Sequence, residues 1–368
     1  MGKIKVGLIG IGNCASAIVQ GVLLSRRDPS RTKEVLYEDI GGYKIGDIEF
    51  VLAIDVDVRK IGKDLGDAIF EGPNIFPRLI DETKTGVKVI AGPVLDGVAE
   101  HMRDIFMPHG KEVSMDDIVR AIKDSGAEII VNMLPVGSEQ ATRFYAEAAL
   151  RAGAAFINGM PVFIASDPKG EWQEKYRKAG LPLLGDDIKG QFGATILHSS
   201  LTALMRERGI TVNETYQLNI GGNTDFLNMK EEERLMSKRE SKTSAVAHTL
   251  KNPAELIQTR RIRIGPSDWV PFLGNTKVAY IYVKATSFLG FPVELDVKLK
   301  VDDKSMYAAA MVDLIRLAKL ALENGLAGPI QEASGYYMKH PPKPVASPFE
   351  AKRMLDEFIN RYGKRASS

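Results

Sequence analysis

The first 200 residues alternate between short apolar runs and longer stretches with helical spacing. Runs rich in β-branched residues predict strands, and apolar positions that recur every three or four residues predict amphipathic helices. Five runs fit the strand pattern: residues 3–10, 49–54, 128–133, 154–158 and 181–184. Strands that alternate with helices in this way favour an α/β fold with a parallel, doubly wound sheet of the Rossmann type.

The pattern changes after Thr215. Three stretches now alternate between apolar and polar residues, at 216–223, 278–290 and 291–303. Helix-like segments separate them, which indicates a mostly antiparallel sheet with helices, an α+β unit. Two further helices are predicted near the end of the chain, over 305–324 and 347–362.

A chain of 368 residues exceeds the size at which one hydrophobic core usually keeps growing, so we expect two domains. We expect the Rossmann domain over 1–200 and the α+β unit over 201–305. Residues 306–368 are expected to complete the Rossmann domain. The α+β unit would then interrupt a single larger fold.

Composition narrows the class of protein. The net charge of +2 gives no case for binding nucleic acid or a membrane surface. Cys14 is the single cysteine, so no intrachain disulfide can form. The N-terminus lacks the apolar region of a signal peptide, and no apolar run is long enough to span a membrane. We therefore expect a cytoplasmic protein.

A glycine turn joins the first predicted strand to the first helix. Gly10, Gly12 and Ala15 occupy the three small positions of a dinucleotide-binding motif, with Asn13 and Cys14 between them. The first position permits the tight turn, the second lets the backbone approach a pyrophosphate, and the third packs helix on strand. The anion then lies at the helix N-terminus. This turn predicts a dinucleotide site.

Asp55 ends the second predicted strand. A carboxylate there suits a ribose diol and would repel a 2′-phosphate, which favours NAD over NADP. The number of residues between the glycine turn and Asp55 is larger than usual for this motif. The polar segment 26–46 accounts for the difference and has the character of an insertion. The alternative is that Asp55 is a solvated residue at a strand end.

Ligands bind beyond the carboxyl ends of parallel strands. Further candidates at such ends are Asn132, Pro135, Ser138, Asn158 and Asp186.

A second small-residue turn follows residue 187 and leads into another helical run. Backbone N–H groups at a helix N-terminus favour an anion. The candidates for contact with a substrate phosphate are Lys189, Gly190, Gln191 and Thr195. Because a dinucleotide would occupy the first turn, a second such turn suggests a phosphorylated substrate. A glycine-rich turn chosen for packing alone explains this segment equally well.

Several lysines stand in suggestive places. Lys238 and Lys242 are spaced i and i+4, so a helix would hold both ammonium groups on one face, where they repel unless an anion compensates. Lys277 precedes a predicted strand, and Lys339 precedes a proline-rich loop. Asp225 and Asp303 lie at similar turn-like places. Taken singly, each lysine is an ordinary solvated residue.

Long segments of the chain resemble the inositol-phosphate synthases, specifically their archaeal and bacterial branch. The matching segments run in family order and cover nearly the whole chain. They are GIGNCAS at 10–16, NMLPVGSE at 132–139, PVFIASDP at 161–168, GDDIKGQFGAT at 185–195, NIGGNTDFLN at 219–228, SKRESKTSAV at 237–246 and DWVPFLGNTK at 268–277.

The resemblance implies conversion of D-glucose 6-phosphate to 1L-myo-inositol 1-phosphate, also called D-myo-inositol 3-phosphate. NAD is recycled within the reaction. It implies active-site roles for Lys238, Lys242, Lys277 and Lys339 and for the carboxylates Asp225 and Asp303. Asp186 is implied near the nicotinamide ribose. A tetramer is implied as well. Some relatives use a divalent or monovalent cation near the substrate phosphate, and the sequence does not identify one here.

The implied chemistry has three stages: oxidation at C5, formation of an enolate, and closure of the ring by attack of C6 on the C1 aldehyde, after which hydride returns to C5. A lysine crowded by other ammonium groups has a lowered pKa and can act as a base. Our preferred assignment makes Lys238 this base, with Lys242 and Lys277 on phosphate or oxyanion. Lys242 and Lys339 stay open as alternatives for the base.

Two other functions are weighed against this one. An NAD-dependent dehydrogenase of a phosphorylated sugar or amino acid joins the same kinds of domain and releases NADH at each turnover. A redox sensor that binds NAD without catalysis would carry an element for binding DNA or a partner. The sequence shows no basic recognition helix of that kind.

Overall fold

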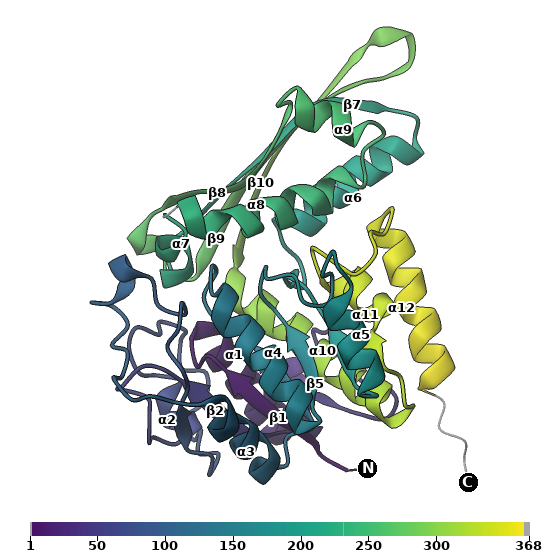
Figure 1. Ribbon diagram of the computed structural model, residues 1–368. Coiled ribbons are helices and arrows are strands. Elements are labelled where there is room, and N and C mark those ends of the chain that lie inside the picture. Colours follow the sequence, from purple (N-terminus) through teal and green to yellow (C-terminus); the bar gives the residue numbers. More distant parts are fainter. Residues whose placement is uncertain (1, 231, 364–368) are drawn as a thin grey trace.

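The computed structural model has two units, one above the other in Figure 1. It describes the backbone of residues 2–230 and 232–363 and the side chains of 2–230 and 240–363. The lower unit holds a seven-stranded sheet between two separate buried apolar clusters, and the upper unit holds a four-stranded sheet. The predicted α/β class, with a second α+β unit inserted, is confirmed.

The large sheet is parallel throughout, with strand order β11-β6-β5-β4-β1-β2-β3. Its strands are β1 Ile4–Ile9, β2 Ile48–Asp55, β3 Val89–Ala91, β4 Ile129–Asn132, β5 Ala155–Asn158, β6 Pro182–Leu184 and β11 Gly328–Pro329. All five runs predicted as strands belong to it. The order changes direction between β1 and β4, and ligands of doubly wound sheets bind at such a switch point.

Helices cover both faces of the parallel sheet, and other helices pack on the four-stranded sheet of the upper unit. Those of the lower unit are α1 Asn13–Arg27, α2 Leu65–Ala68, α3 Met115–Ser125, α4 Glu139–Ala152, α5 Glu171–Lys178, α10 Asp303–Glu323, α11 Gln331–Tyr337 and α12 Pro348–Tyr362. Those of the upper unit are α6 Ala194–Glu207, α7 Thr224–Asn228, α8 Glu232–Ala247 and α9 Pro253–Gln258. In the part of the chain that the structure describes, no helix is long and apolar enough to cross a membrane.

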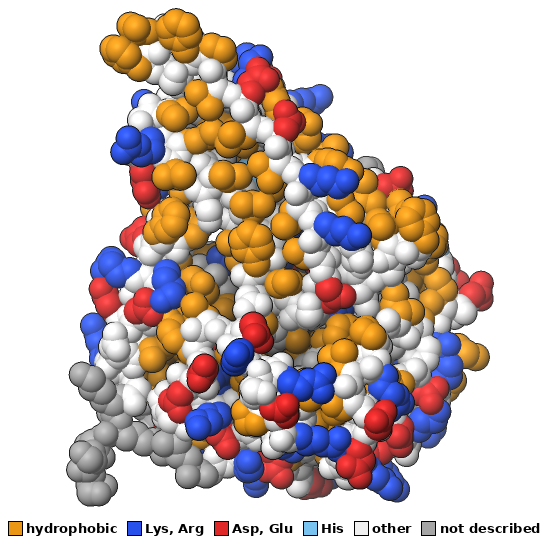
Figure 2. Space-filling view, turned by 180° about the vertical axis from the view of Figure 1, so that it is seen from behind, with side chains coloured by type: hydrophobic (Ala, Val, Ile, Leu, Met, Phe, Trp, Pro, Cys, Tyr) orange, Lys and Arg blue, Asp and Glu red, His pale blue; other side chains and the backbone are white. Residues whose placement is uncertain are grey.

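The smaller sheet has the order β10-β9-β7-β8. Its strands are β7 Thr211–Gly221, β8 Ile262–Trp269, β9 Thr276–Thr286 and β10 Pro292–Asp302. β9 is antiparallel to both of its neighbours, while β7 and β8 are parallel, so the expected mostly antiparallel sheet is present. The β9–β10 hairpin extends beyond the rest of the molecule, and hydrophobic side chains gather at its tip (Figure 2).

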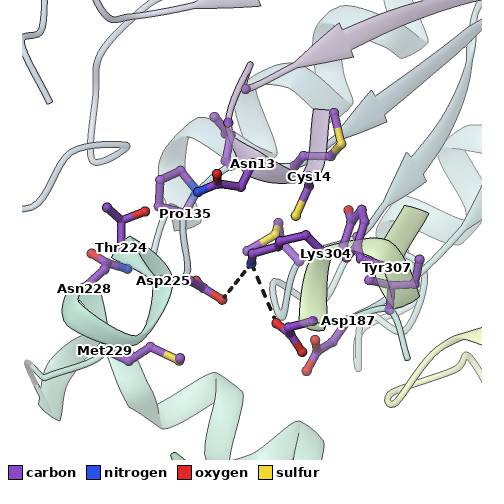
Figure 3. A pocket seen from close by; sticks show the side chains of 18 of the residues that line it. Asn13, Cys14, Pro135, Asp187, Thr224, Asp225, Asn228, Met229, Lys304 and Tyr307 are labelled. Carbon is purple, nitrogen blue, oxygen red and sulfur yellow. Dashed lines mark ion pairs between the residues drawn. The ribbon is translucent and has the colours of Figure 1, made fainter. Parts of the chain in front are cut away.

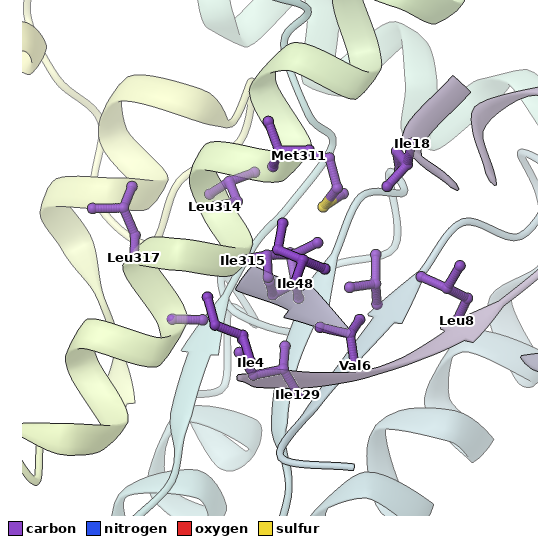
Figure 4. Packing of buried hydrophobic residues seen from close by; sticks show 14 of the residues in the cluster. Ile4, Val6, Leu8, Ile18, Ile48, Ile129, Met311, Leu314, Ile315 and Leu317 are labelled. Atoms are coloured by element: carbon purple, nitrogen blue, oxygen red, sulfur yellow. The ribbon is translucent and has the colours of Figure 1, made fainter. Parts of the chain in front are cut away.

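Helix α10 joins the two units. It begins directly after β10, where the Asp302 carboxylate caps it by accepting hydrogen bonds from two backbone N–H groups. Farther along, Leu314 and Ile315 are fully buried against Ile4 and Ile129 of the parallel sheet (Figure 4). Each such side chain contributes about 1.5–3 kcal/mol of burial free energy. After α10, β11 adds to the edge of the large sheet, so the chain returns to the first unit.

Arg316 of α10 holds the polar segment that the sequence marked as an insertion. Its guanidinium is fully buried and pairs with Asp313. It also donates hydrogen bonds to the carbonyl oxygens of Tyr37, at 2.8 Å, and of Glu38, at 3.1 Å. The buried Arg316 guanidinium therefore anchors the inserted segment on helix α10 through these hydrogen bonds.

We predict that Arg316→Met lowers the free energy of unfolding by about 3–5 kcal/mol, because it removes the ionic partner of the buried Asp313 carboxylate and leaves it only the hydrogen bond from Tyr337. Urea denaturation measures the loss. Arg353→Met is the matched control, since Arg353 pairs with Glu357 on an exposed helix face and such pairs contribute at most about 1 kcal/mol. Equal stability of the two variants would contradict this account.

Candidate active site

One cavity lies where the carboxyl ends of the parallel strands meet the inserted unit. The start of α1 and the ends of β1 and β2 line one side, and α7, α8 and the first turn of α10 line the other. Figure 3 shows side chains from both units pointing into it. A cavity bounded by two units at the switch point of the sheet is the expected position for a ligand.

The glycine turn after β1 forms one wall. Gly10 has φ of +88°, and a Cβ there would lie 2.9 Å from the Met133 carbonyl oxygen, so only glycine fits. A Cβ on Gly12 would meet no atom within 4 Å, which leaves open space in front of the N-terminus of α1. Asn13 supports the turn, because its side-chain oxygen accepts hydrogen bonds from the backbone N–H groups of Ile75 and Phe76.

Asp55 lies at the end of β2 and lines the same wall. Its carboxylate accepts a hydrogen bond from the Ile11 backbone N–H at 2.7 Å, which ties it to the glycine turn. The Lys60 ammonium lies 3.8 Å from it and donates to the Ile11 carbonyl oxygen. Lys60 was not among the sequence candidates, because nothing in its local pattern distinguishes it from a surface lysine.

The second turn leads into α6 and forms another part of the cavity. Lys189, Gly190 and Thr195 all line it, and a Cβ on Gly193 would meet no atom within 4 Å. Burial and the neighbouring Lys339 ammonium lower the pKa of Lys189 to about 7. Two helix N-termini, those of α1 and α6, therefore border one cavity.

Three of the four candidate lysines line the cavity. Lys242 is 3% exposed, and Lys277 donates a hydrogen bond to Asp303 at 2.9 Å. Lys339 donates to the Asp187 carboxylate at 2.8 Å, and Ser241 donates to the same carboxylate. The side chain of the fourth candidate, Lys238, lies outside the described residues.

The candidate carboxylates Asp225 and Asp303 also line the cavity, together with Lys304, which the sequence did not single out. Burial alone would raise the pKa of Asp303, but the ammonium groups of Lys277 and Lys304 hold that pKa well below its ordinary value. Lys304 directly follows Asp303 in the chain. This adjacency was the available signal, and it is indistinguishable from an ordinary charged pair at a helix start.

Several sequence candidates are not among the described residues that line the cavity. One of them is Asp186, whose carboxylate is fully buried and accepts hydrogen bonds from Asn158 and from the backbone N–H groups of Ile164 and Ser166. Burial raises the pKa of Asp186 to about 6. Asp186 thus holds the 164–166 loop, and its neighbour Asp187 faces the cavity instead.

The other sequence candidates that do not line the cavity have local contacts elsewhere, and these contacts explain where they lie. The Asn132 amide donates to Thr142 and Asn158, and the Ser138 hydroxyl donates to the Pro135 carbonyl oxygen. Ala15 is buried in the core on the far side of the turn. The exposed Gln191 amide donates to the Glu34 carbonyl oxygen, away from the cavity. Gly10, Gly12, Asn13, Cys14, Asp55 and Pro135 do line it.

Comparison with known proteins identifies the family. Residues 193–304 match the family described as myo-inositol-1-phosphate synthase. Over 97% of its length the chain is 45% identical to the inositol-3-phosphate synthase of Corynebacterium glutamicum, covering 98% of that protein. The chain belongs to the inositol-3-phosphate synthase family. The synthase of Mycolicibacterium smegmatis is 43% identical, again over 97% of this chain and 98% of the relative.

A solved structure extends the likeness to the fold. The myo-inositol-1-phosphate synthase-related protein of Thermotoga maritima superposes with a TM-score of 0.77 at 25% identity, covering 97% of this chain and 98% of that one. The segment that matches the synthase family contains Asp225, Lys277, Asp303 and Lys304. These cavity residues therefore lie in the part of the chain that carries the family pattern.

Proposed function

We propose that the protein converts D-glucose 6-phosphate to 1L-myo-inositol 1-phosphate, the compound also named D-myo-inositol 3-phosphate, with NAD recycled in each turnover. The proposal rests on one observation: two helix N-termini and a cluster of lysines border a single cavity in a member of the synthase family. One terminus suits a dinucleotide pyrophosphate, and the other suits a sugar phosphate.

The residues around the first turn fit NAD. Gly12 leaves room for close approach of a pyrophosphate, and the Asp55 carboxylate suits a ribose diol. Bound there, NAD would supply the hydride acceptor for oxidation at C5 of the sugar and the hydride donor for the later reduction. The chain's own part is to hold both ligands at one cavity and to keep the reacting carbons away from water.

We also propose a cytoplasmic location, which suits a chain with a single cysteine.

We assign the substrate phosphate to Lys189, Gly190 and Thr195 at the start of α6. Lys277 pairs with Asp303 and Lys339 pairs with Asp187, so both ammonium groups are held at the cavity, where they can stabilise an enolate oxygen. Lys242, buried on α8, is assigned to the same oxyanion or to the phosphate. Lys238 stays our candidate for the base that takes the C5 hydroxyl proton.

A test follows from the recycling of the cofactor. Purified protein is incubated with glucose 6-phosphate and NAD, the phosphate esters are followed by phosphorus NMR, and reduced cofactor is followed by absorbance. We expect a new, non-reducing phosphate ester and no net NADH. Steady accumulation of NADH would identify a dehydrogenase instead. Binding of NAD without any conversion of the sugar phosphate would favour the sensor.

A matched pair of glycine variants tests the assignment of the two turns. Both Gly12→Val and Gly193→Val add a side chain into open space at negative φ, so neither should prevent folding. We expect Gly12→Val to weaken NAD binding at least about tenfold and Gly193→Val to raise the KM for glucose 6-phosphate by a similar factor, because each blocks access to backbone N–H groups. Calorimetry and steady-state kinetics measure the two effects. An exchange of the two phenotypes would overturn the assignment.

We further propose that the protein is a homo-oligomer, a tetramer in keeping with the family, in which the inserted sheet supplies a contact between copies. The tip of the β9–β10 hairpin carries Phe288, 85% exposed, and Leu289, 76% exposed, followed by the exposed Phe291. Hydrophobic side chains gathered on a projecting hairpin favour a protein contact. β10 is also an edge strand of its sheet, which another chain can cover.

We predict that changing Phe288, Leu289 and Phe291 together to serine lowers the oligomer mass in light scattering after size-exclusion chromatography. The control is Phe349→Ser, which removes an exposed phenylalanine from α12 in the other unit and should leave the mass unchanged. An unaltered mass in the hairpin variant would place the interface elsewhere.

A further inference from the structure

Lys304 is a buried cation that lines the cavity. It lies in the first turn of α10, immediately after the chain leaves the inserted sheet, and it is 5% exposed. In Figure 3 its side chain extends toward Asp225 of α7, with Cys14 at the start of α1 near by. The ammonium therefore lies near the start of α1 and beside the carboxylates of Asp225 and Asp303.

The neighbours of Lys304 form a row of alternating charges. The Lys304 nitrogen is 3.7 Å from one oxygen of Asp303 and 3.9 Å from one oxygen of Asp225. The other Asp303 oxygen accepts a hydrogen bond from Lys277 at 2.9 Å. Neither of the two Lys304 distances is that of a hydrogen bond. The ammonium is thus held by charge on both sides, with its N–H groups within reach of the cavity.

This nitrogen stays charged. Although burial alone would lower the pKa of Lys304, Cys14, Asp225 and Asp303 together raise it above its ordinary value. Asp303 is correspondingly kept ionised by Lys277 and Lys304. The Lys304 ammonium thus places a fixed positive charge between two carboxylates. In its absence, a bound metal ion or ammonium ion would have to supply that charge.

The same charge is needed once ligands bind. Two phosphate-bearing ligands would bring further negative charge to a cavity that already contains the carboxylates of Asp225 and Asp303. At short separations within a partly buried site, like charges repel by several kcal/mol. The described residues that line the cavity include six lysines and four aspartates, a formal surplus of two positive charges: Lys60, Lys189, Lys242, Lys277, Lys304 and Lys339, against Asp55, Asp187, Asp225 and Asp303.

A separate metal ion does not fit at this position. Calcium and magnesium need oxygen ligands at about 2.0–2.6 Å, and a divalent ion bridging Asp225 and Asp303 would meet the Lys304 ammonium in the same space. Among the residues that the structure describes, no group of three or more His, Cys, Asp or Glu side chains is arranged to hold a metal. The residues at this point of the chain therefore do not fit the added cation that the family resemblance implies for some relatives.

We propose that the Lys304 ammonium is the built-in cation of this site, standing where a free ion would bind between Asp225 and Asp303. Turnover then needs no added metal or monovalent cation. The proposal rests on the proposed function, because it concerns the ligands of that reaction. It adds Lys304 to the lysines that the sequence indicated and gives it a role as a charge between two carboxylates.

Removal of the side chain and replacement of its charge test the proposal. Lys304→Ala removes the ammonium and leaves space for a small cation. Lys304→Met removes the charge but fills the space. Activity is measured by conversion of glucose 6-phosphate, with and without chelator, in buffers that contain only a large quaternary ammonium as counter-ion. Ammonium, methylammonium or magnesium is then added to each protein.

We expect the unmodified protein to be indifferent to the chelator and to all three cations. Lys304→Ala should lose activity on the order of 10²-fold, the usual effect of removing one electrostatic contact to the transition state, and should recover part of it saturably with a small cation. Lys304→Met should lose as much and should not recover. Lys300→Ala, on the exposed face of β10, is the matched control and should behave as the unmodified protein does.

Three outcomes would overturn the proposal: loss of activity of the unmodified protein in chelator or without small cations, full activity of Lys304→Ala, or equal rescue of the alanine and methionine variants. Circular dichroism and NAD binding check that each variant is folded. If the alanine variant does not fold, the methionine variant and the chelator experiment decide. Failure of the proposed function has a different signature, since the unmodified protein would then form no inositol phosphate in any buffer.

Discussion

The burial of helix α10 against the parallel sheet fixes the position of the cavity and of most residues around it. The middle of the helix is locked into the core by Leu314, Ile315 and their neighbours, so its first turn has little freedom to move. That first turn carries Asp303 and Lys304, and it is continuous with β10 of the inserted sheet. One packed helix thereby sets the relation between the cofactor side of the cavity and the side that would hold the substrate.

Charge pairing makes such a lysine-rich cavity compatible with a stable fold. An isolated ammonium group loses several kcal/mol of hydration when it is buried, and several of them at one place repel each other as well. The Lys277–Asp303 and Lys339–Asp187 pairs offset this cost while leaving the lysine nitrogens at the cavity surface. The Lys189 ammonium donates a hydrogen bond to the Gly335 carbonyl oxygen at 3.2 Å, and burial together with the neighbouring Lys339 ammonium lowers the pKa of Lys189 to about 7.

The elements could be predicted from the sequence because each depends on a local pattern. Apolar runs identified the five main strands, and the small residues at Gly10 and Gly12 identified the first ligand turn. Side-chain direction was harder to predict. Asp186 and Asp187 are adjacent and chemically identical. Only the packing of the 164–166 loop decides which of the two carboxylates accepts the hydrogen bonds of the backbone N–H groups. Lys304 was missed for a related reason, since its partner Asp225 is far away in sequence.

The two helix N-termini at the cavity differ in what surrounds them, and this difference explains how one site can distinguish two phosphate-bearing ligands. The start of α1 has the Asp55 carboxylate beside it, which suits a ribose and disfavours an extra phosphate. The start of α6 has Lys189 and Lys339 near it, which favour a compact dianion. Lys304 lines the same cavity, and on the proposed assignment its positive charge would lower the repulsion that arises when both sites are filled. On the proposed assignment, the cavity holds two anion sites that share the Lys304 ammonium.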